Sequence, residues 1–229
     1  MKKGKFFVIE GTDGSGKSEQ FWLLKSRLEV NNYKVATFDF PQYEKESSFF
    51  VRQYLNGAYG GWKDVGHYKA SLFYAMDRFD ISPKIREAID RGEIVISNRY
   101  VGSNLGHQGS KISPREREEF FKWDYDLEFN ILNIPKPDLN IVLHVPAEIA
   151  QELVNKKGER KYLEGKKRDI HEDDINHLRA AEETYLQIVD MWPEEYKLVE
   201  CVKNGTLLLI NEIHQKVWKI IASVIAEEE

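Results

Sequence analysis

Two hydrophobic patterns alternate along the chain. One is a short continuous apolar run, typical of a strand covered on both faces; the other is a longer segment with apolar residues every three or four positions, typical of an amphipathic helix. The first pattern predicts strands at Phe6–Ile9, Val35–Phe40, Glu93–Ser97, Leu139–Val145 and Tyr196–Val202. The second predicts helices at Lys17–Asn31, Tyr68–Arg91, Ala147–Lys156, Glu172–Met191 and Thr206–Ala226.

This alternation predicts an α/β fold in which a five-stranded parallel sheet carries helices on both faces. Because proline disfavours helical geometry at the residue before it, we expect the second helix to be interrupted near Ser82-Pro83. Ser113-Pro114 predicts a further helix start, with a capping hydroxyl and a proline at the first position. No internal repeat or composition break divides residues 1–229, which predicts a single domain with mobile inserts.

The composition is ordinary for a soluble globular protein, with 41% hydrophobic and 31% charged residues among 229. A net charge of −5 argues against binding to a nucleic-acid backbone, although it permits a small phosphorylated ligand. The single cysteine, Cys201, excludes an intrachain disulfide and a cysteine metal cluster, and its apolar surroundings predict a buried thiol. No segment approaches the length of a membrane span, so the expected location is the cytoplasm.

The segment from Gly11 to Ser18 matches the pattern G-x-x-x-x-G-K-[ST] in full. It follows a predicted strand and opens a predicted helix, so its N–H groups and the helix N-terminus should surround a phosphate. Lys17 would reach the β- and γ-phosphates of ATP, and the Ser18 hydroxyl would bind Mg²⁺. The residues predicted to bind the ATP phosphates are Gly11, Asp13, Gly14, Ser15, Gly16, Lys17 and Ser18. A plain glycine-rich turn is the alternative, and the motif alone does not separate GTPases, motor ATPases and small-molecule kinases.

Further polar side chains should meet this phosphate cradle at the carboxyl edge of the sheet, where open parallel sheets bind ligands. Those that follow predicted strands are Asp13, Tyr43, Arg99 and Asn104. Tyr74 and Arg78 lie four residues apart on one helical face, where the ring could stack on a base and the guanidinium could bond to its carbonyl. The alternatives are a core tyrosine beside a surface arginine and, for Asp13, a carboxylate that stabilises a turn.

Several segments match one family in order and spacing: Phe40–Tyr43, Leu72–Arg78, Asn98–Asn104, Pro135–Asp138 and Arg168–Glu172. Together with the cradle, they make the chain resemble the thymidylate kinase family over nearly its whole length. The resemblance implies a P-loop NTPase fold and transfer of the γ-phosphoryl group of ATP onto dTMP, which gives dTDP for dTTP synthesis. It also implies ATP and Mg²⁺ as cofactors and a homodimer. No one of these segments is as specific as the cradle.

Position by position, the resemblance implies a dTMP site. Asp13 would hold the deoxyribose 3′-hydroxyl, and Phe40 and Tyr43 would line the sugar pocket, with Tyr43 crowding a ribose 2′-hydroxyl. Family members usually have phenylalanine where this chain has Tyr74, and often an aromatic residue where it has His107.

The resemblance also assigns the base, the acceptor phosphate and the catalytic charges. Tyr74 would stack on thymine, Arg78 and Asn104 would read its edge, and Arg99 would grip the acceptor phosphate. The implied dTMP-binding residues are Asp13, Phe40, Tyr43, Tyr74, Arg78, Arg99, Asn104, His107 and His171. The implied catalytic residues are Lys17, Arg99, Arg160 and Arg168.

The basic stretch Lys156–Arg168 belongs in this family to a lid, here at about residues 156–171, that closes over the phosphates, although most charge runs are simply solvated loops. Some members carry arginine at the position of Gly14, whereas others have glycine there and supply arginine from the lid. The chain resembles the second kind, which points to Arg160 and Arg168. His171 would approach the sugar from the far end of the lid.

Asn98 departs from the family pattern, because aspartate usually stands at this position. The missing carboxylate puts direct Mg²⁺ binding by Asn98 in doubt, although an amide can hold a metal-bound water or orient Arg99. The acceptor phosphate has a second pKa of about 6 and is mostly a dianion at neutral pH, so no general base is strictly needed. We therefore expect an active enzyme.

Three other functions remain open. A kinase for another nucleoside monophosphate, such as dUMP, UMP or CMP, would differ in how it reads the base edge. A regulatory GTPase would need a guanine-reading Asn-Lys-x-Asp after a strand, and the only Asn-Lys pair, Asn155-Lys156, continues as Lys157-Gly158. A non-catalytic nucleotide-binding scaffold is suggested by Asn98.

Overall fold

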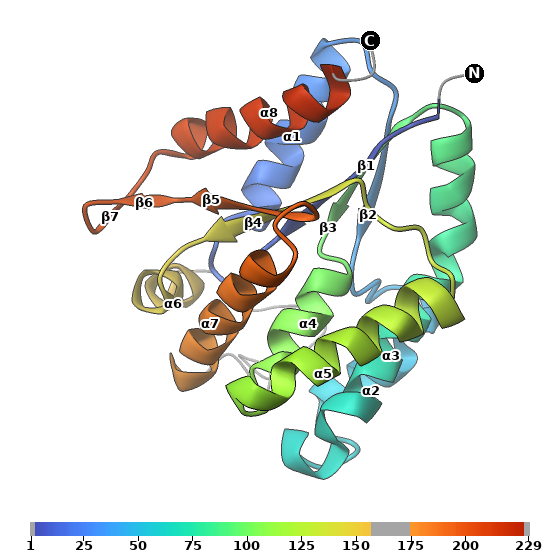
Figure 1. Cartoon of the computed structure of the whole chain (residues 1–229), viewed down its shortest axis with the longest axis vertical. Coiled ribbons are helices and arrows are strands. Elements are labelled where there is room, and N and C mark those ends of the chain that lie inside the picture. The colour runs from blue at the N-terminus through green and yellow to red at the C-terminus, as the bar shows by residue number, and fades with distance from the viewer. Residues whose placement is uncertain (1–2, 157–174, 227–229) are drawn as a thin grey trace.

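The computed structural model describes residues 3–156 and 175–226. At its centre lies a five-stranded sheet in the order β2-β3-β1-β4-β5, in which every neighbouring pair of strands is parallel (Figure 1). The strands are β1 Phe6–Glu10, β2 Val35–Asp39, β3 Ile94–Asn98, β4 Leu139–His144 and β5 Tyr196–Glu200. The predicted fold class and all five predicted strands are confirmed, with strand ends that differ by one or two residues.

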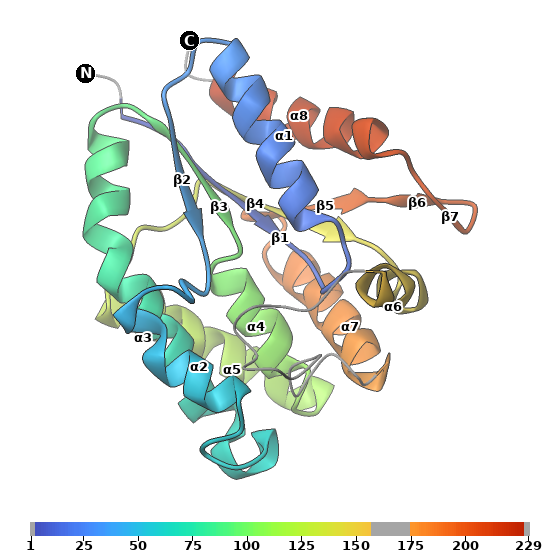
Figure 2. The ribbon, with the colours of Figure 1, turned by 180° about the vertical axis from the view of Figure 1, so that it is seen from behind.

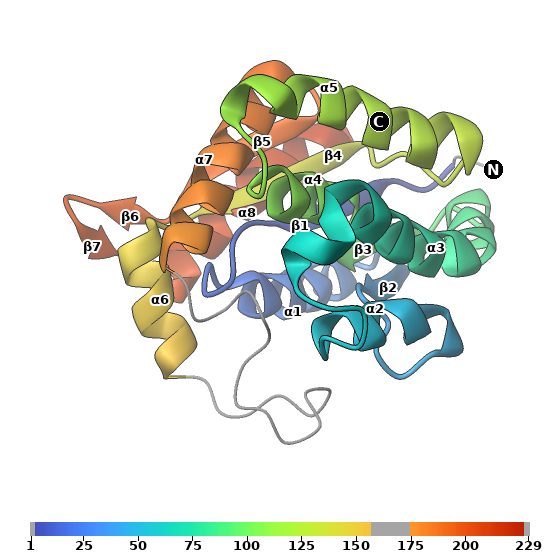
Figure 3. The same cartoon turned by 90° about the horizontal axis from the view of Figure 1, so that it is seen from below.

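Helices cover both faces of this sheet. They are α1 Lys17–Val30, α2 Phe49–Leu55, α3 Trp62–Asp90, α4 Val101–Gly109, α5 Pro114–Tyr125, α6 Ala147–Asn155, α7 Ile175–Met191 and α8 Ile210–Ala226, with a 3-10 turn at Glu46–Ser48 and a π-helix at Asp126–Ile131. Helices α1 and α8 lie side by side on one face (Figures 1 and 2). Helices α4, α5 and α7 lie on the other face, as the view along the layers shows (Figure 3).

Alternate residues of β1 divide the core into two layers. Phe7 and Ile9 pack with α1 and α8, whereas Phe6 and Val8 pack with α3, α4, α5 and α7. All four side chains are fully buried, as expected for a central parallel strand covered on both faces. This core fixes the strand that leads directly into the cradle.

The predicted break in the second helix is wrong. Helix α3 continues through Pro83 and departs from helical backbone angles at Gly66 instead, where φ is 75° and ψ is 163°. Proline removes only one N–H donor, and the flanking Ile81 and Ile85 hold the helix against the core. Gly66 accommodates the break because glycine tolerates a positive φ.

The end of the chain contains an element that the pattern did not predict. Between β5 and α8, Val202–Lys203 (β6) and Thr206–Leu207 (β7) form a small antiparallel hairpin. Asn204 and Gly205 make its turn, with φ of 51° and 75°, a conformation that asparagine and glycine favour. The sequence pattern places Val202 in the preceding strand and Thr206–Leu207 in the following helix, with Lys203–Gly205 as the connection between them.

Three smaller predictions can also be checked. Pro114 opens α5 as predicted, and Glu116 accepts a hydrogen bond from the backbone N–H of the capping residue Ser113 at 3.3 Å. Cys201 is fully buried, and burial raises the pKa of its thiol to about 12. Within residues 3–156 and 175–226, no helix has the length and apolar character needed to span a membrane.

Candidate active site

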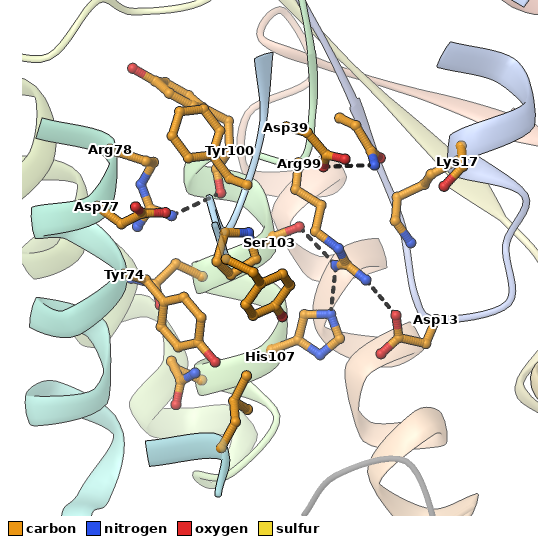
Figure 4. Close-up of a pocket in the computed structure, with 18 of the residues that line it drawn as sticks. Asp13, Lys17, Asp39, Tyr74, Asp77, Arg78, Arg99, Tyr100, Ser103 and His107 are labelled. Atoms are coloured by element: carbon orange, nitrogen blue, oxygen red, sulfur yellow. Dashed lines mark hydrogen bonds and ion pairs between the residues drawn. The ribbon is translucent and has the colours of Figure 1, made fainter. Parts of the chain in front are cut away.

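A cleft of about 370 Å³ opens at the carboxyl edge of the sheet, where β1, β2 and β3 end (Figure 4). Its volume lies within the range of pockets that hold small ligands. The predicted site residues that line it are Asp13, Gly14, Gly16, Lys17, Ser18, Phe40, Tyr43, Tyr74, Arg78, Asn98, Arg99, Asn104 and His107. The structure therefore brings the cradle and the proposed nucleotide-binding side chains together in one cleft.

Five other predicted residues are not part of this lining. Gly11 and Ser15 belong to the cradle and are buried. Arg160, Arg168 and His171 lie outside the described residues, as does nearly all of the predicted lid.

Glycine is required in the cradle because three positions have a positive φ, namely 138° at Gly11, 83° at Gly14 and 85° at Gly16. A Cβ atom at Gly11 would lie 2.7 Å from the carbonyl oxygen of Leu143. A Cβ atom at Gly14 would lie 2.2 Å from the carbonyl oxygen of Ala150 in α6. Because α6 packs so closely, the cradle has no room for a side chain at position 14.

The polar atoms of the cradle suit an anionic ligand. Lys17 is largely buried, and its Nζ donates to the carbonyl oxygens of Gly11 at 3.0 Å and Thr12 at 2.7 Å. The hydroxyls of Thr12 and Ser15 are buried without a hydrogen-bond partner among the described residues. Buried polar groups are nearly always hydrogen-bonded, so these two hydroxyls fit a ligand that carries acceptor oxygens. Ser18, one residue further, is exposed in the cleft.

Arg99 occupies the middle of the cleft. It follows β3 with a φ of 67°, which is uncommon for residues other than glycine and is often found at functional sites. Its guanidinium forms an ion pair with Asp13 and donates hydrogen bonds to Ser103 Oγ and His107 Nε2, both at 3.0 Å (Figure 4). Burial is the largest influence and disfavours the charge, but the Asp13 carboxylate and the nearby Tyr185 and Glu10 together outweigh it, so the pKa of Arg99 is raised above its ordinary value.

His107 is a neutral partner of Arg99. Burial, and then the Arg99 charge, hold the pKa of His107 well below its ordinary value. A neutral ring can accept the Arg99 hydrogen bond at Nε2, which leaves the proton on Nδ1. His107 therefore orients the guanidinium without competing with it for an anion.

Arg78 and Tyr74 form the wall of the cleft that lies opposite Lys17 and Asp13 (Figure 4). The Tyr74 ring lies edge-on to that of Tyr54, with 6.5 Å between the ring centroids. Arg78 is 2% exposed, and its Nε and one terminal nitrogen donate to the Glu128 carboxylate, which the π-helix buries completely. Its other terminal nitrogen donates to the Tyr100 carbonyl at 3.4 Å. Burial opposes the charge, but Glu128 outweighs it, so the pKa of Arg78 is raised. The alternative of a surface arginine is wrong.

A second buried acid holds Asn104. Asn104 Nδ2 donates to Asp124 Oδ1 at 2.9 Å, and Asp124 is fully buried in α5. Burial, and then the charge of the nearby Glu128, raise the pKa of Asp124 well above its ordinary value. Asn104 Oδ1 is buried without a partner among the described residues, so this cleft residue keeps one acceptor for a ligand.

Glu10, which the sequence analysis did not identify, accepts several hydrogen bonds close to Arg99. It ends β1, is fully buried, and accepts hydrogen bonds from the Tyr100 N–H at 2.8 Å, Ser103 Oγ at 2.6 Å and the Tyr185 hydroxyl at 3.2 Å. Two of these partners, Tyr100 and Ser103, follow Arg99 in the chain, so the contacts fix the backbone next to Arg99. The available signal was a charged residue at the end of an apolar strand, directly before the cradle.

Asp39, also missed, stands opposite Asn98. The two residues end β2 and β3 and are paired in the strand register. Asn98 Nδ2 donates to Asp39 Oδ1 at 2.9 Å. Asp39 is accessible from the cleft. Burial of its carboxyl group between the cleft walls raises the pKa of Asp39, and the positive charge of Arg99 only partly opposes this shift. Its position at the end of a predicted strand was the available signal.

The loop after β2 is anchored to α3 by Asp77, a further residue that the sequence did not reveal. Asp77 accepts a hydrogen bond from the Gln42 N–H at 2.8 Å. Phe40, before this anchor, is nearly buried, and its ring lies 5.5 Å from that of Tyr100. The anchor keeps Tyr43 in the cleft lining.

The family model described as thymidylate kinase matches residues 9–213, which include every residue in the cleft lining. The chain belongs to the thymidylate kinase family. The resemblance that the motifs predicted is therefore confirmed.

Relatives within the thymidylate kinase family match most of the chain. The thymidylate kinase of Mycobacterium tuberculosis (strain H37Rv) is 29% identical over 182 residues, which span 79% of this chain and 84% of the relative. A probable thymidylate kinase of Thermococcus kodakarensis is 28% identical over 228 residues, which span 97% of this chain and 100% of the relative. A solved structure of the thymidylate kinase of Candida albicans has a TM-score of 0.73 at 21% identity and covers 96% of this chain and 92% of its own, a likeness of fold.

Proposed function

We propose that this member of the thymidylate kinase family transfers the γ-phosphoryl group of ATP to dTMP, as a single domain acting in the cytoplasm. The supporting observation is that the cradle and the wall formed by Tyr74 and Arg78 line one cleft, with Arg99 between them (Figure 4). Phosphoryl transfer needs two phosphate groups held in line and surrounded by positive charge. A cleft with an anion cradle at one end and a base-sized wall at the other suits that task.

The donor would bind at the cradle. Its phosphate oxygens would accept hydrogen bonds from the loop N–H groups and from the hydroxyls of Thr12 and Ser15, which are unpartnered among the described residues. Lys17 would move from backbone carbonyls to the phosphates. Because position 14 has no room for a side chain, further positive charge must come from elsewhere, which supports the lid residues Arg160 and Arg168.

The acceptor phosphate would bind at Arg99. The phosphate would replace the Asp13 carboxylate as the partner of the guanidinium, and Asp13 would then be released to accept a hydrogen bond from the 3′-hydroxyl of the sugar. Since the acceptor is mostly a dianion at neutral pH, its oxygen attacks without help from a general base. Phe40, Tyr43, His107 and His171 would complete the sugar side.

The base would bind between Tyr74 and the polar wall. The ring would stack on thymine, Arg78 would donate to a ring carbonyl, and the unpartnered Asn104 Oδ1 would accept the N3–H. Thymine and uracil carry a proton at N3, whereas cytosine does not. This arrangement favours dTMP over cytidine acceptors.

The residues present also fit Mg²⁺. Ser18 and Asp39 are accessible in the cleft, and Asn98 Oδ1 is buried without a partner among the described residues, so the candidate donors are all oxygens. Oxygen is the ligand atom that Mg²⁺ prefers. When bound, the ion would neutralise charge on the transferring phosphates.

An acceptor panel tests the proposal. Purified protein with ATP and Mg²⁺ is offered dTMP, dUMP, UMP and CMP, and ADP formation is measured. We expect dTMP to have the highest kcat/KM and CMP the lowest. Absence of turnover with dTMP, or a preference for UMP or CMP, would refute the proposed substrate.

We also propose that the protein forms a homodimer through α3. Its outer face carries a stripe of apolar residues that are each 40–47% exposed, namely Tyr68, Leu72, Met76 and Phe79. Exposed apolar patches commonly mark interfaces. Light scattering should give twice the monomer mass for wild type and for the control Leu209→Glu, and the monomer mass for Leu72→Glu. A monomeric wild type would refute the proposal.

A further inference from the structure

A carboxylate faces the side of the cleft that would receive the phosphates. Asp39 lines the cleft and lies toward Arg99 and Lys17, away from Tyr74 (Figure 4). Asn98 Nδ2 donates to its Oδ1 at 2.9 Å. In the part of the chain that the structure describes, no basic side chain forms a salt bridge with this carboxylate.

Such a carboxylate opposes phosphate binding unless a cation accompanies it. Two phosphate-bearing ligands bring several negative charges, and like charges a few ångströms apart repel. In the proposed function, Lys17 and Arg99 are occupied by the phosphates themselves. A separate cation is therefore needed beside Asp39.

The neighbouring atoms suit a hard divalent cation. The Ser18 hydroxyl is accessible in the same cleft. Asn98 Oδ1 is buried, and no partner for it occurs within residues 3–156 and 175–226. A carboxylate, a hydroxyl and an amide oxygen form the type of donor set that binds Mg²⁺, directly or through its water shell.

The strand register explains how a carboxylate can act from position 39. Asp39 and Asn98 are paired residues at the ends of adjacent parallel strands, and such strands lie about 4.8 Å apart. The carboxylate that the family pattern places at position 98 is thus absent there but present one strand away. Mg²⁺ usually keeps several water ligands, so contact through water can span this displacement.

We propose, on the basis of the proposed kinase function, that Asp39 supplies the carboxylate that holds the metal–nucleotide complex through metal-bound water. Asn98 is a positioning residue that keeps this carboxylate directed into the cleft. The pair divides between two side chains a task that a single aspartate would otherwise carry.

Exchange of the two side chains tests this assignment. The affinity of Mn²⁺ for the complex of each protein with ADP is measured by electron paramagnetic resonance, which requires no phosphate acceptor. Asp39→Asn should weaken Mn²⁺ binding about tenfold or more, as is typical when a partner of a metal site is lost. The double variant Asp39→Asn/Asn98→Asp should return to within about threefold of wild type, because the carboxylate is restored one strand away.

The controls separate metal binding from folding and from the proposed function. Asp90→Asn removes the same charge from the exposed end of α3 and should leave Mn²⁺ affinity unchanged. The thermal midpoint and ADP affinity in excess EDTA verify an intact cradle in each variant. Unchanged Mn²⁺ affinity in Asp39→Asn, or a double variant as weak as Asp39→Asn, overturns the proposal. Failure of wild type to phosphorylate dTMP would refute the kinase function instead, since the Mn²⁺ measurement does not depend on the acceptor.

Discussion

Arg99 and Arg78 lie in the walls of the same cleft and each pairs with a carboxylate, but the two pairs differ in their exposure to solvent. Arg99 pairs with Asp13, and both side chains are partly exposed, at 17% and 16%. Arg78 pairs with Glu128, and these side chains are 3% and 0% exposed. Solvent can reach and screen the first pair, so it costs less to separate than the second, in which removal of one partner leaves an uncompensated buried charge. The phosphate side of the cleft can therefore exchange partners during binding, while the base side is fixed before any ligand arrives.

The largest effect is expected at the phosphate side, where the buried ammonium group of Lys17 supplies positive charge in the cradle. Lys17→Ala should lower kcat by about two to four decades, since it removes a preorganised charge at the transferring phosphate. Lys25→Ala, on the surface of the same helix, is the matched control. A Lys17→Ala variant within about threefold of wild type would show that the cradle does not act on the phosphates.

The base side should respond in stability rather than in rate. Glu128→Gln is expected to lower the free energy of unfolding by about 3–5 kcal/mol, because it leaves the Arg78 charge buried and unpaired. Urea denaturation measures this loss. Glu118→Gln, which disrupts only an exposed pair with Lys122, should have no measurable effect. A loss below about 1 kcal/mol for Glu128→Gln would remove the distinction between the two arginines.

Asp13→Asn should affect substrate discrimination more than it affects stability. Because solvent reaches its pair with Arg99, the loss of unfolding free energy should be smaller than that of Glu128→Gln. Discrimination between dTMP and its 3′-deoxy analogue should fall about tenfold or more, since a hydrogen bond to a charged group is lost. Both are measured on one preparation, by urea denaturation and by kcat/KM. Full discrimination in Asp13→Asn would remove Asp13 from the sugar site.

The smallest effect concerns pH and the neutral His107. Its folded-state pKa is lowered, so the folded state resists protonation and loses stability as pH falls below the ordinary value of about 6.5. At pH 6.0 wild type should have lost about 0.8 kcal/mol from this source. His107→Gln, which keeps an acceptor for Arg99, should lack that part of the decline. Identical stability profiles from pH 7.5 to 5.5 would contradict a neutral His107.

The sequence predicted the phosphate side of the cleft better than the base side. The reason is the number of residues that separate the interacting side chains along the chain. The cradle is contiguous, and its glycines indicate its backbone directly. The Arg78–Glu128 pair spans 50 residues and the Asn104–Asp124 bond spans 20, so no local pattern indicates either one. Acids on an amphipathic helix are normally solvated, and only the packing of α5 and the π-helix shows that these two are buried.

The fold shows the same limit. Apolar runs located all five strands, since strand burial depends on the residues of the run itself. Helix α3 breaks at Gly66, outside the predicted helix, and continues through Pro83, where the flanking Ile81 and Ile85 are buried in the core. The pairing of Asp39 with Asn98 depends on strand register, which hydrophobic pattern alone does not determine.

The measurement that tests the account most directly is calorimetric binding of dTMP and of thymidine to wild type and to Arg99→Ala. If Arg99 holds the acceptor phosphate while a separate fixed wall holds the base, Arg99→Ala should lose about 30-fold or more in dTMP affinity, because a charge-assisted contact is removed. Thymidine affinity should stay within about threefold of wild type, since that ligand has no phosphate for Arg99 to bind. Equal losses for both ligands, or no loss for dTMP, would contradict the division of the cleft into a phosphate side and a base side.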